Sequence, residues 1–559
     1  MRLPALARPD MELREASAMV RLYKRAVNKP VVLIILAMLL AVCVSRGVSI
    51  GHEATLHPDE RYFFQSSVSL KDKLLDFDST YKAAKVYPEG AFVFQVPFHL
   101  LEQLLCSLTG QPENARLWGR IASVFYFSLG CVLGALVLYR YFGKKPGMVA
   151  LYAVIMTFSL FHIEQSRYGT GDAISFFLLT AAVFASALFL EKDKKWFLFL
   201  SGFAVGALAA VKYPQLFFLL YPVGALALYR RARNARLRHT LCLAAGLFAA
   251  TATGFLLFSP SALVNPGYIP EAISRELSSY MVSGNRAEVG SPLEHLVSLL
   301  VYQLFYSDLP LSLPIAAYAV FRLLAQAKSS RSSAELFFAA FIPAGMLIFF
   351  IYNLFITTVF FRTYYPYFCL CALYTSWGLY QLMSKKLMRA AALSLCVLMV
   401  GRGVFFIAVL SEPSRGDVLL ETLTQHEAWE DRKATVTLGN IYHSGGVSIP
   451  GPTRNVPMDA LYAGAFPELQ PGEFLVTAPL DYCFAEDYLF PITHGLVRTL
   501  IDGWQDFKAA NRPYYIGQPY PDAYYLLFGY WLHGSSGTMF ELPTNYVYYR
   551  GYGPTAAAD

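Results

Sequence analysis

Long apolar runs separated by short polar stretches occupy the first three quarters of the chain. A helix that crosses a bilayer needs about 20 mostly apolar residues, and eleven runs of this kind lie between residues 30 and 410. The predicted spans are 30–50, 119–140, 147–164, 173–190, 196–212, 214–229, 240–259, 296–321, 334–354, 364–384 and 388–410. The pattern therefore predicts a polytopic α-helical membrane protein.

The polar stretches alternate in charge from one side of the membrane to the other. The N-terminal segment 1–29 and every second connection are rich in Lys and Arg, and together they hold 24 of the 46 basic residues. The basic connections are 140–146, 191–195, 230–238, 322–331 and 384–389. The positive-inside rule places these stretches and the N-terminus in the cytoplasm. Since no small-residue cleavage site is visible near the first span, we expect it to be a retained signal anchor.

Two large segments then fall on the outer, non-cytoplasmic side. The first outer loop, 51–118, contains an amphipathic run at 90–108 that we expect to lie on the membrane as a helix. If this run were a span, every later loop would change sides and the charge pattern would be lost. Residues 411–559 are richer in Pro and Gly and predict a small α/β domain. Its expected strands are Ala434–Leu438, Glu473–Thr477 and Tyr546–Tyr549.

Composition excludes several classes of protein. Of the 559 residues, 55% are hydrophobic and 15% are charged, and the mean hydropathy is +0.41. A disordered chain or an ordinary soluble enzyme carries more charge than this. The net charge of +7 is small and widely spread, so we expect no nucleic-acid partner.

Ionisable residues near bilayer depth are energetically costly and usually functional. Four groups of such residues emerge on the same outer side of the predicted spans, and they contain His57, Asp59, Glu60, Glu164, Arg167, Asp172, Lys212 and Arg362. Nothing in their spacing along the sequence requires this shared side. A single pocket at the outer membrane boundary, lined by acids and bases from separate helices, accounts for it.

These residue types suit transfer of a group from a lipid phosphate. Arg167 and Arg362 can bind a phosphate through two parallel hydrogen bonds, and Lys212 can bind it as a point charge. Asp59 can accept the proton of an attacking hydroxyl as a general base. The cations would stabilise the charge on the departing phosphate.

Each residue also has a plainer interpretation. The acidic pair of the first loop can simply be solvated. Arg167 and Asp172 can form a structural ion pair between two helices, and Lys212 can extend to the lipid head groups. Arg362 can anchor lipid phosphates without specificity. The shared side of the membrane is what favours the functional interpretation.

Five motifs occur in the order HPDERYFFQS at 57–66, YPEGAFVFQVPFHLL at 87–101, EQSRYGTGDAISFFLL at 164–179, GFAVGALAAVKYP at 202–214 and FFRTYYPYFCLCALYTSWGL at 360–379. Together they resemble the GT-C glycosyltransferases, in particular the branch with the protein O-mannosyltransferases and the aminoarabinose transferase of lipid A. The HPDE element is also similar to that of the lipid-linked mannosyltransferases of glycan and anchor assembly. The resemblance covers about residues 30–410.

The resemblance implies the GT-C fold and an inverting transfer of a hexosyl or pentosyl group from a polyprenyl-phosphate donor. The acceptor would be a protein, a glycolipid or a polysaccharide on the non-cytoplasmic face. The residues it assigns are Asp59 as base with Glu60 beside it, Arg167, Lys212 and Arg362 as donor-phosphate contacts, and Asp172, Glu164 and Tyr364 as groups that orient the acceptor or Arg167. The outer segments contain no Asn-x-Ser/Thr sequon, which favours a bacterial inner membrane.

Some points stay open at this stage. Glu89 stands where the related YPPG stretch has a proline, so it either contacts the donor or adds an acid. Metal use varies within the superfamily, and a divalent metal remains an option, with His57 and His162 as candidate ligands although no HxxxH spacing is present. A transporter or lipid-linked sugar flippase and a noncatalytic scaffold are the alternative functions.

Overall fold

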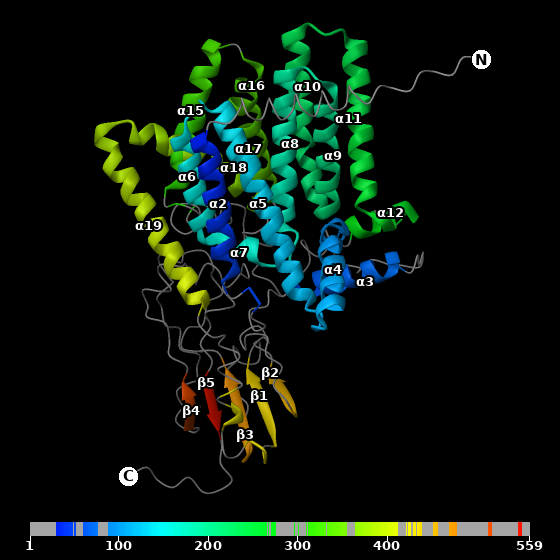
Figure 1. Ribbon diagram of the computed structural model, residues 1–559, viewed down its shortest axis with the longest axis vertical. Helices are drawn as coiled ribbons and strands as arrows, with labels where there is room; N and C mark the ends of the chain where they lie inside the picture. The colour runs from blue at the N-terminus through cyan, green and yellow to red at the C-terminus, as the bar shows by residue number, and fades with distance from the viewer. Residues whose placement is uncertain are drawn as a thin grey trace, which may run out of the picture.

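The computed structural model describes most of the helical region and five strands. The described residues are 29–48, 50–51, 60–75, 88–264, 270–274, 311–330, 332–354, 364–411, 423–425, 429–431, 433–438, 451–456, 469–477, 512–516 and 546–549, with the single positions 267, 296, 300, 309 and 421. Asp59, His57 and Arg362 lie outside them. The helices form an upright bundle, and the strands form a sheet drawn beyond its lower end (Figure 1).

The helices follow the predicted spans closely. The first part of the bundle contains α2 (Lys29–Gly47), α3 (Glu60–Leu75), α4 (Gly90–Thr109), α5 (Ala115–Tyr141), α6 (Pro146–Phe158), α7 (Leu160–Arg167), α8 (Asp172–Lys192) and α9 (Lys195–Val211). The second part contains η1 (Tyr213–Leu219), α10 (Leu220–Arg233), α11 (Leu237–Leu257), α12 (Pro260–Val264), α15 (Ser312–Ser330), α16 (Ser333–Leu336), η2 (Phe337–Phe341), α17 (Ile342–Leu354), α18 (Tyr365–Met383) and α19 (Lys386–Ser411).

The helices have the length and surface of membrane spans. Seven of the described helices are long and apolar enough to cross a bilayer, or eight if the bent pair α6–α7 is one span. Large apolar side chains point outward from them, such as Leu40 on α2 at 68% exposure and Leu387 on α19 at 84%. The chain is thus an integral, mostly helical membrane protein, as the sequence predicts. The count of eleven spans and their orientation stay predictions.

Two predicted spans differ from simple helices for identifiable reasons. The span 147–164 breaks at Ser159, and its halves α6 and α7 meet at 61°. Ser159 is extended and its hydroxyl accepts from the His162 amide at 3.4 Å, so it starts a new helix. The span 214–229 starts as the 3₁₀ segment η1 and becomes α-helical only in α10. Pro222 lies in the first turn of α10, where its missing N–H costs no intrahelical bond.

The end of the span predicted at 296–321 lies in α15, which runs from Ser312 to Ser330. Most of residues 296–310 lie outside the described residues.

Glycine sets the spacing of the central helices. A Cβ atom on Gly206 of α9 would lie 1.9 Å from the Thr251 carbonyl oxygen of α11, and one on Gly254 would lie 2.2 Å from the Phe203 carbonyl oxygen. The two backbones therefore touch directly. Small residues at helix contacts are typical of packing in lipid, where burial of apolar surface gives little driving force.

The sheet has the strand order β2-β1-β3-β5-β4. Its strands are β1 (Ala434–Leu438), β2 (Thr453–Val456), β3 (Glu473–Thr477), β4 (Arg512–Ile516) and β5 (Tyr546–Tyr549). β1 pairs parallel with β2 and β3, while β5 pairs antiparallel with β3 and β4. The three strands predicted from sequence are present at the predicted residues.

Buried charged residues gather at one end of the bundle. α2, α7, α9 and α11 end there and α5 and α8 begin there, at the lower end in Figure 1. We call it the site end.

The close contact of α9 and α11 gives a first testable prediction. Gly206→Ala should lower the free energy of unfolding by about 1–3 kcal/mol, because the new methyl group must push two backbones apart. The matched control is Gly401→Ala on α19, where a Cβ meets no atom within 4 Å; it should leave stability unchanged or raise it by up to about 1 kcal/mol. Thermal unfolding in detergent measures both. Equal melting temperatures for the two variants would contradict the packing described.

Candidate active site

The loop between α7 and α8 is the centre of the site end. We call residues 168–171 the site loop. The Gly169 amide donates to Glu60 Oε1 at 2.7 Å, and the Gly169 carbonyl oxygen accepts from Gln95 Nε2 at 2.8 Å. Gln95 in turn accepts from the Ser67 hydroxyl at 2.9 Å. The site loop is thus held from both sides, by α3 and by α4.

Glu60 forms a buried, bidentate ion pair with Arg120. Arg120 Nε and Nη2 donate to the two Glu60 oxygens at 2.7 and 2.8 Å, and both side chains are at most 2% exposed. Arg120 also donates to the Ile50 carbonyl at 2.9 Å, just beyond α2. Arg120 binds both oxygens of the Glu60 carboxylate, and the Gly169 amide binds one of them as well. Glu60 is therefore placed to hold α3 and the site loop in position.

Asp172 forms a second buried pair, with Lys212. The Lys212 ammonium donates to Asp172 Oδ1, and Thr170 Oγ1 donates to Asp172 Oδ2 at 3.1 Å. The Asp172 side chain is 3% exposed, whereas that of Lys212 is 27% exposed. The acid therefore lies inside, while the Lys212 side chain is partly exposed at the end of α9.

Two glycines of the motifs allow this close approach. A Cβ on Gly90, at the start of α4, would lie 2.6 Å from the Ala210 carbonyl carbon of α9. A Cβ on Gly171, before α8, would lie 2.9 Å from Val211 Cγ1. The starts of α4 and α8 therefore pack on the last turn of α9, next to Lys212.

Arg46 is a functional candidate that the sequence analysis missed. It is fully buried at the end of α2 and donates to the Thr157 and Met156 carbonyls at 2.5 and 2.6 Å and to the Ser166 hydroxyl at 3.0 Å. Within the described part of the chain no carboxylate pairs with it. It therefore closes the end of α6 at the break and holds α7 in place. Arg46 and Arg120 could have been identified from the sequence, because each is a lone charged residue inside a predicted span.

Other predicted residues are placed on the same end. Arg167 ends α7, and its Nη2 donates to the Val48 carbonyl at 2.9 Å. Glu164 lies one turn earlier on α7 and is 6% exposed. Tyr364 is buried directly before α18, with its ring 5.7 Å from that of Phe350. Asp59 directly precedes Glu60, the first residue of α3, but lies outside the described residues together with Arg362.

Glu89 connects the start of α4 to α12. It is buried, and it accepts from the Ser261 amide at 2.8 Å and from the Ser261 hydroxyl. Burial raises the pKa of the Glu89 carboxyl, and the two bonds from Ser261 oppose this rise. The sequence left open whether Glu89 contacts the donor or adds an acid to the site. The geometry shows neither role directly; it shows a carboxyl group that caps the start of α12.

The described residues offer no group of three His, Cys, Asp or Glu side chains that could hold a metal ion. His162 is fully buried between the Phe127 and Tyr365 rings, at centroid distances of 6.0 and 5.5 Å.

The fold and the site define a polytopic helical membrane protein with buried charge pairs at one end of its bundle. No protein-family model matches the chain, and no curated protein matches it. Solved structures do match. The chain is similar to ArnT from Cupriavidus metallidurans bound to undecaprenyl phosphate, with 14% identity, a TM-score of 0.47, and coverage of 81% of this chain and 93% of that one.

The chain is also similar to two further solved structures. The Archaeoglobus fulgidus oligosaccharyltransferase in the apo form has 12% identity, a TM-score of 0.45, and coverage of 77% and 64% of the two chains. The S. cerevisiae protein O-mannosyltransferase Pmt1-Pmt2 complex, bound to its sugar donor, has 21% identity, a TM-score of 0.31, and coverage of 48% and 36%. At this distance the function has to be argued from the residues of the chain itself.

The pair of Glu60 and Arg120 yields a prediction about stability. Glu60→Ala should lower the free energy of unfolding by about 3–5 kcal/mol, because it leaves the Arg120 guanidinium buried without a counter-charge. The double variant Glu60→Ala/Arg120→Met should be more stable than Glu60→Ala alone. Chemical unfolding in detergent measures both values. The single variant Arg120→Met completes the comparison. If the double variant lost as much unfolding free energy as Glu60→Ala and Arg120→Met lose together, the two residues would act independently.

Glu89 yields a prediction about pH. Its folded-state pKa is raised above 4.5, so the stability it contributes is present at lower pH and is lost as pH rises through the folded-state pKa. Glu89→Gln, which keeps the size of the side chain and cannot ionise, should weaken this loss. We expect the melting temperature of the wild type to fall more than that of the variant between pH 4.5 and neutral pH. Parallel curves for the two proteins would contradict a raised pKa.

Proposed function

We propose that the chain is a glycosyltransferase that moves a hexosyl or pentosyl group from a polyprenyl-phosphate donor to a hydroxyl acceptor. The observation that carries the proposal is the convergence of two acid–base pairs, each with a buried carboxylate, on one site loop at one end of a membrane bundle. The five motifs that resemble GT-C enzymes contribute most of these residues. A lipid donor fits a site whose charges lie where a head group would lie.

Asp59 is the proposed general base. It directly precedes Glu60, whose pairing with Arg120 fixes the first turn of α3. In the proposed reaction, the acceptor oxygen attacks the anomeric carbon and its proton passes to the Asp59 carboxylate. The bond from that carbon to the phosphate oxygen breaks, and the electron pair leaves with the polyprenyl phosphate. Attack opposite the leaving group inverts the anomeric configuration.

The donor phosphate is proposed to bind Lys212, Arg167 and Arg362. Support comes from Lys212, whose ammonium binds the buried Asp172 and whose side chain is 27% exposed. An ammonium has three donors, so donors remain for a phosphate. Asp172 would then orient Lys212. Buried cations near a leaving phosphate favour the transition state because its negative charge develops there.

Glu164 and Tyr364 are proposed to orient the acceptor, which is a protein, a glycolipid or a polysaccharide. By the charge pattern of the sequence, the site faces the non-cytoplasmic side, and the setting we propose is a bacterial inner membrane. A divalent metal is compatible with an acidic first loop.

The test uses the purified chain in lipid nanodiscs with labelled polyprenyl-phosphate sugars and a membrane extract as the source of acceptors. Asp59→Asn should lower the rate of transfer by about 100- to 10,000-fold, the range typical of a lost general base, with an unchanged melting temperature. Asp72→Asn, on the exposed side of α3, is the matched control and should keep full activity.

Full transfer in Asp59→Asn would exclude Asp59 as the base. Absence of transfer with every donor, together with movement of a lipid-linked sugar across vesicles that contain the protein, would favour a flippase instead.

A further inference from the structure

Two buried amide side chains have oxygens without a hydrogen-bond partner within the described part of the chain. They belong to Gln215 of η1 and Asn353 of α17, which are 3% and 1% exposed. Buried polar atoms nearly always have a partner in the protein, in water or in a ligand. Neither residue takes part in the ion pairs of the site end, so these two oxygens need a separate explanation.

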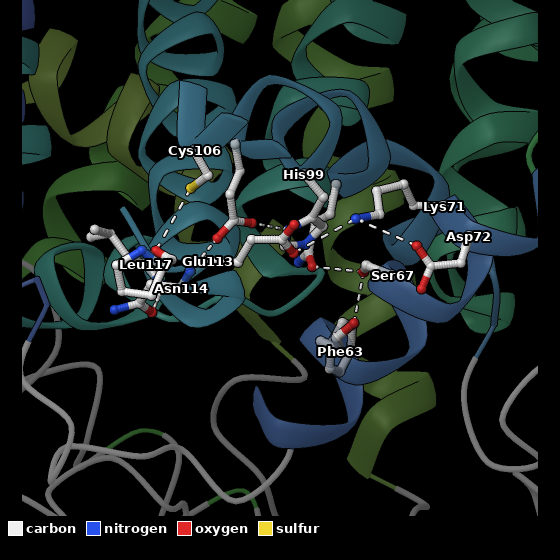
Figure 2. Close-up of polar contacts among 12 residues, drawn as sticks. Phe63, Ser67, Lys71, Asp72, His99, Cys106, Glu113, Asn114 and Leu117 are labelled. Atoms are coloured by element: carbon white, nitrogen blue, oxygen red, sulfur yellow. Dashed lines mark hydrogen bonds and ion pairs between the residues drawn. The ribbon is translucent and has the colours of Figure 1, made fainter. Parts of the chain in front are cut away.

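Other buried polar side chains at the site end show the usual situation (Figure 2). The Ser67 hydroxyl donates to Gln95 Oε1 at 2.9 Å, and His99 Nδ1 lies 3.1 Å from Glu102 Oε2. The amide oxygen of Gln95 therefore has a donor in the protein, although its side chain is as buried as the two amides above.

Contacts between two antiparallel segments place the two amides opposite each other. One segment runs through η1 and α10, and the other runs through η2 and α17. The pairs in contact are Gly224 with Phe341, Tyr221 with Gly345, and Phe218 with Phe349. From one pair to the next, the residue number falls by three on the first segment and rises by four on the second. The next pair in this series is Gln215 with Asn353.

The local geometry supports this last step of the series. Phe218 and Gln215 lie in the 3₁₀ segment η1, where side chains three residues apart eclipse each other and the rise between them is about 6 Å. Phe349 and Asn353 lie in α17, where side chains four residues apart share a face and the rise is again about 6 Å. Since the Phe218 and Phe349 rings lie 4.9 Å apart, the two amides face each other one turn closer to the site end.

Lys212 lies one further turn toward the site end. The backbone amide of Gln215 donates to the Lys212 carbonyl at 2.9 Å, so one hydrogen-bonded turn joins the two residues. Asn353 Nδ2 donates to the Phe349 carbonyl at 2.8 Å, which fixes the orientation of this amide and turns its oxygen away from that bond. Two uncharged acceptors thus lie beside the cation that is proposed to bind the donor phosphate.

A ligand that fits two such acceptors is a hydrogen-bond donor. The oxygens of an ionised phosphate are themselves acceptors, so a phosphate does not fit here. A sugar ring is uncharged and carries several hydroxyl groups, each of which can donate to an amide oxygen. In a polyprenyl-phosphate sugar the ring is bonded directly to the phosphate, and its hydroxyl groups lie at a distance comparable with one helical turn of about 5.4 Å.

We infer that Gln215 and Asn353 form a subsite for the sugar ring of the donor, in which each amide oxygen accepts a hydrogen bond from a ring hydroxyl. The inference rests on the proposed function, in which Lys212 binds the donor phosphate. The two residues bind the substrate and take no part in the proton transfer. They select among sugars, because a missing or inverted hydroxyl leaves a buried acceptor unpaired.

Lipid binding in the absence of an acceptor tests the inference. The full chain in nanodiscs is titrated with undecaprenyl phosphate, undecaprenyl phosphate glucose and undecaprenyl phosphate arabinose, and the dissociation constants are measured. The double variant Gln215→Met/Asn353→Leu should bind the sugar lipids about 10- to 100-fold more weakly, the effect of two lost hydrogen bonds between neutral groups. It should bind undecaprenyl phosphate as the wild type does, because Lys212 is unchanged.

Two further variants complete the series. Gln103→Met, on the exposed side of α4, is the matched control and should bind all three lipids like the wild type. Gln215→Asn, which withdraws the amide by one methylene group, should show a smaller loss for the sugar lipids alone, and it serves if the double variant does not fold. The melting temperature of the double variant should equal or exceed that of the wild type, since neither oxygen loses a bond.

Undiminished binding of the sugar lipids by the double variant would overturn the inference. Equal weakening for all three lipids would overturn it too, because the phosphate contact would then be the one disturbed. A wild type that prefers undecaprenyl phosphate to both sugar lipids would overturn the subsite and leave the phosphate site in place. A wild type that binds none of the three would remove the proposed donor, and the subsite with it.

Discussion

The hydrogen bonds to the Gly169 peptide group are the constraint on which the site end depends. Its amide binds Glu60 and its carbonyl binds Gln95, so one peptide group connects α3, α4 and the site loop. Arg120 extends this connection to α5 and to the chain leaving α2. Five segments that are far apart in the sequence therefore share one small network of hydrogen bonds. Removing any member leaves a buried polar group unsatisfied, which is costly at low dielectric.

The signs of the charges at the site end match the helix ends that carry them. Glu60 and Asp172 are the first residues of α3 and α8, where a helix favours negative charge. Arg46 and Arg167 lie in the last turns of α2 and α7, and Lys212 directly follows α9, where positive charge is favoured. Alternating helix directions in a bundle thus place acids and bases side by side at a single end. Such an end is suited to a substrate with an anionic head group and an apolar tail.

Helix α4 belongs to this network through Gln95. Its polar residues Gln95, His99 and Glu102 are buried in the protein, and within the described part of the chain its leucines are exposed. The sequence predicts a helix lying on the membrane at 90–108. The structure adds that the polar side chains of this helix are buried in the protein instead of facing water.

Much of the fold and part of the site are readable from the sequence, because hydrophobic length and charge placement are local properties. Apolar runs predict the helices, short strand-like runs predict three of the strands, and the motif residues Asp172 and Lys212 stand out by their positions at the outer ends of predicted spans. The break at Ser159 and the roles of Arg46 and Arg120 are not found this way. They depend on carbonyl groups and acids that lie up to 111 positions away along the chain.

The sequence by itself determined that this is a membrane protein and which residues carry charge at bilayer depth, since solvation in lipid acts on each segment separately. Only the tertiary structure decided which charges pair: Glu60 with Arg120, and Asp172 with Lys212. The pairing of Asp172 with Lys212 accompanies the close approach of α4 and α8 to the last turn of α9 at Gly90 and Gly171. That approach is a property of three packed helices, and no single segment contains it.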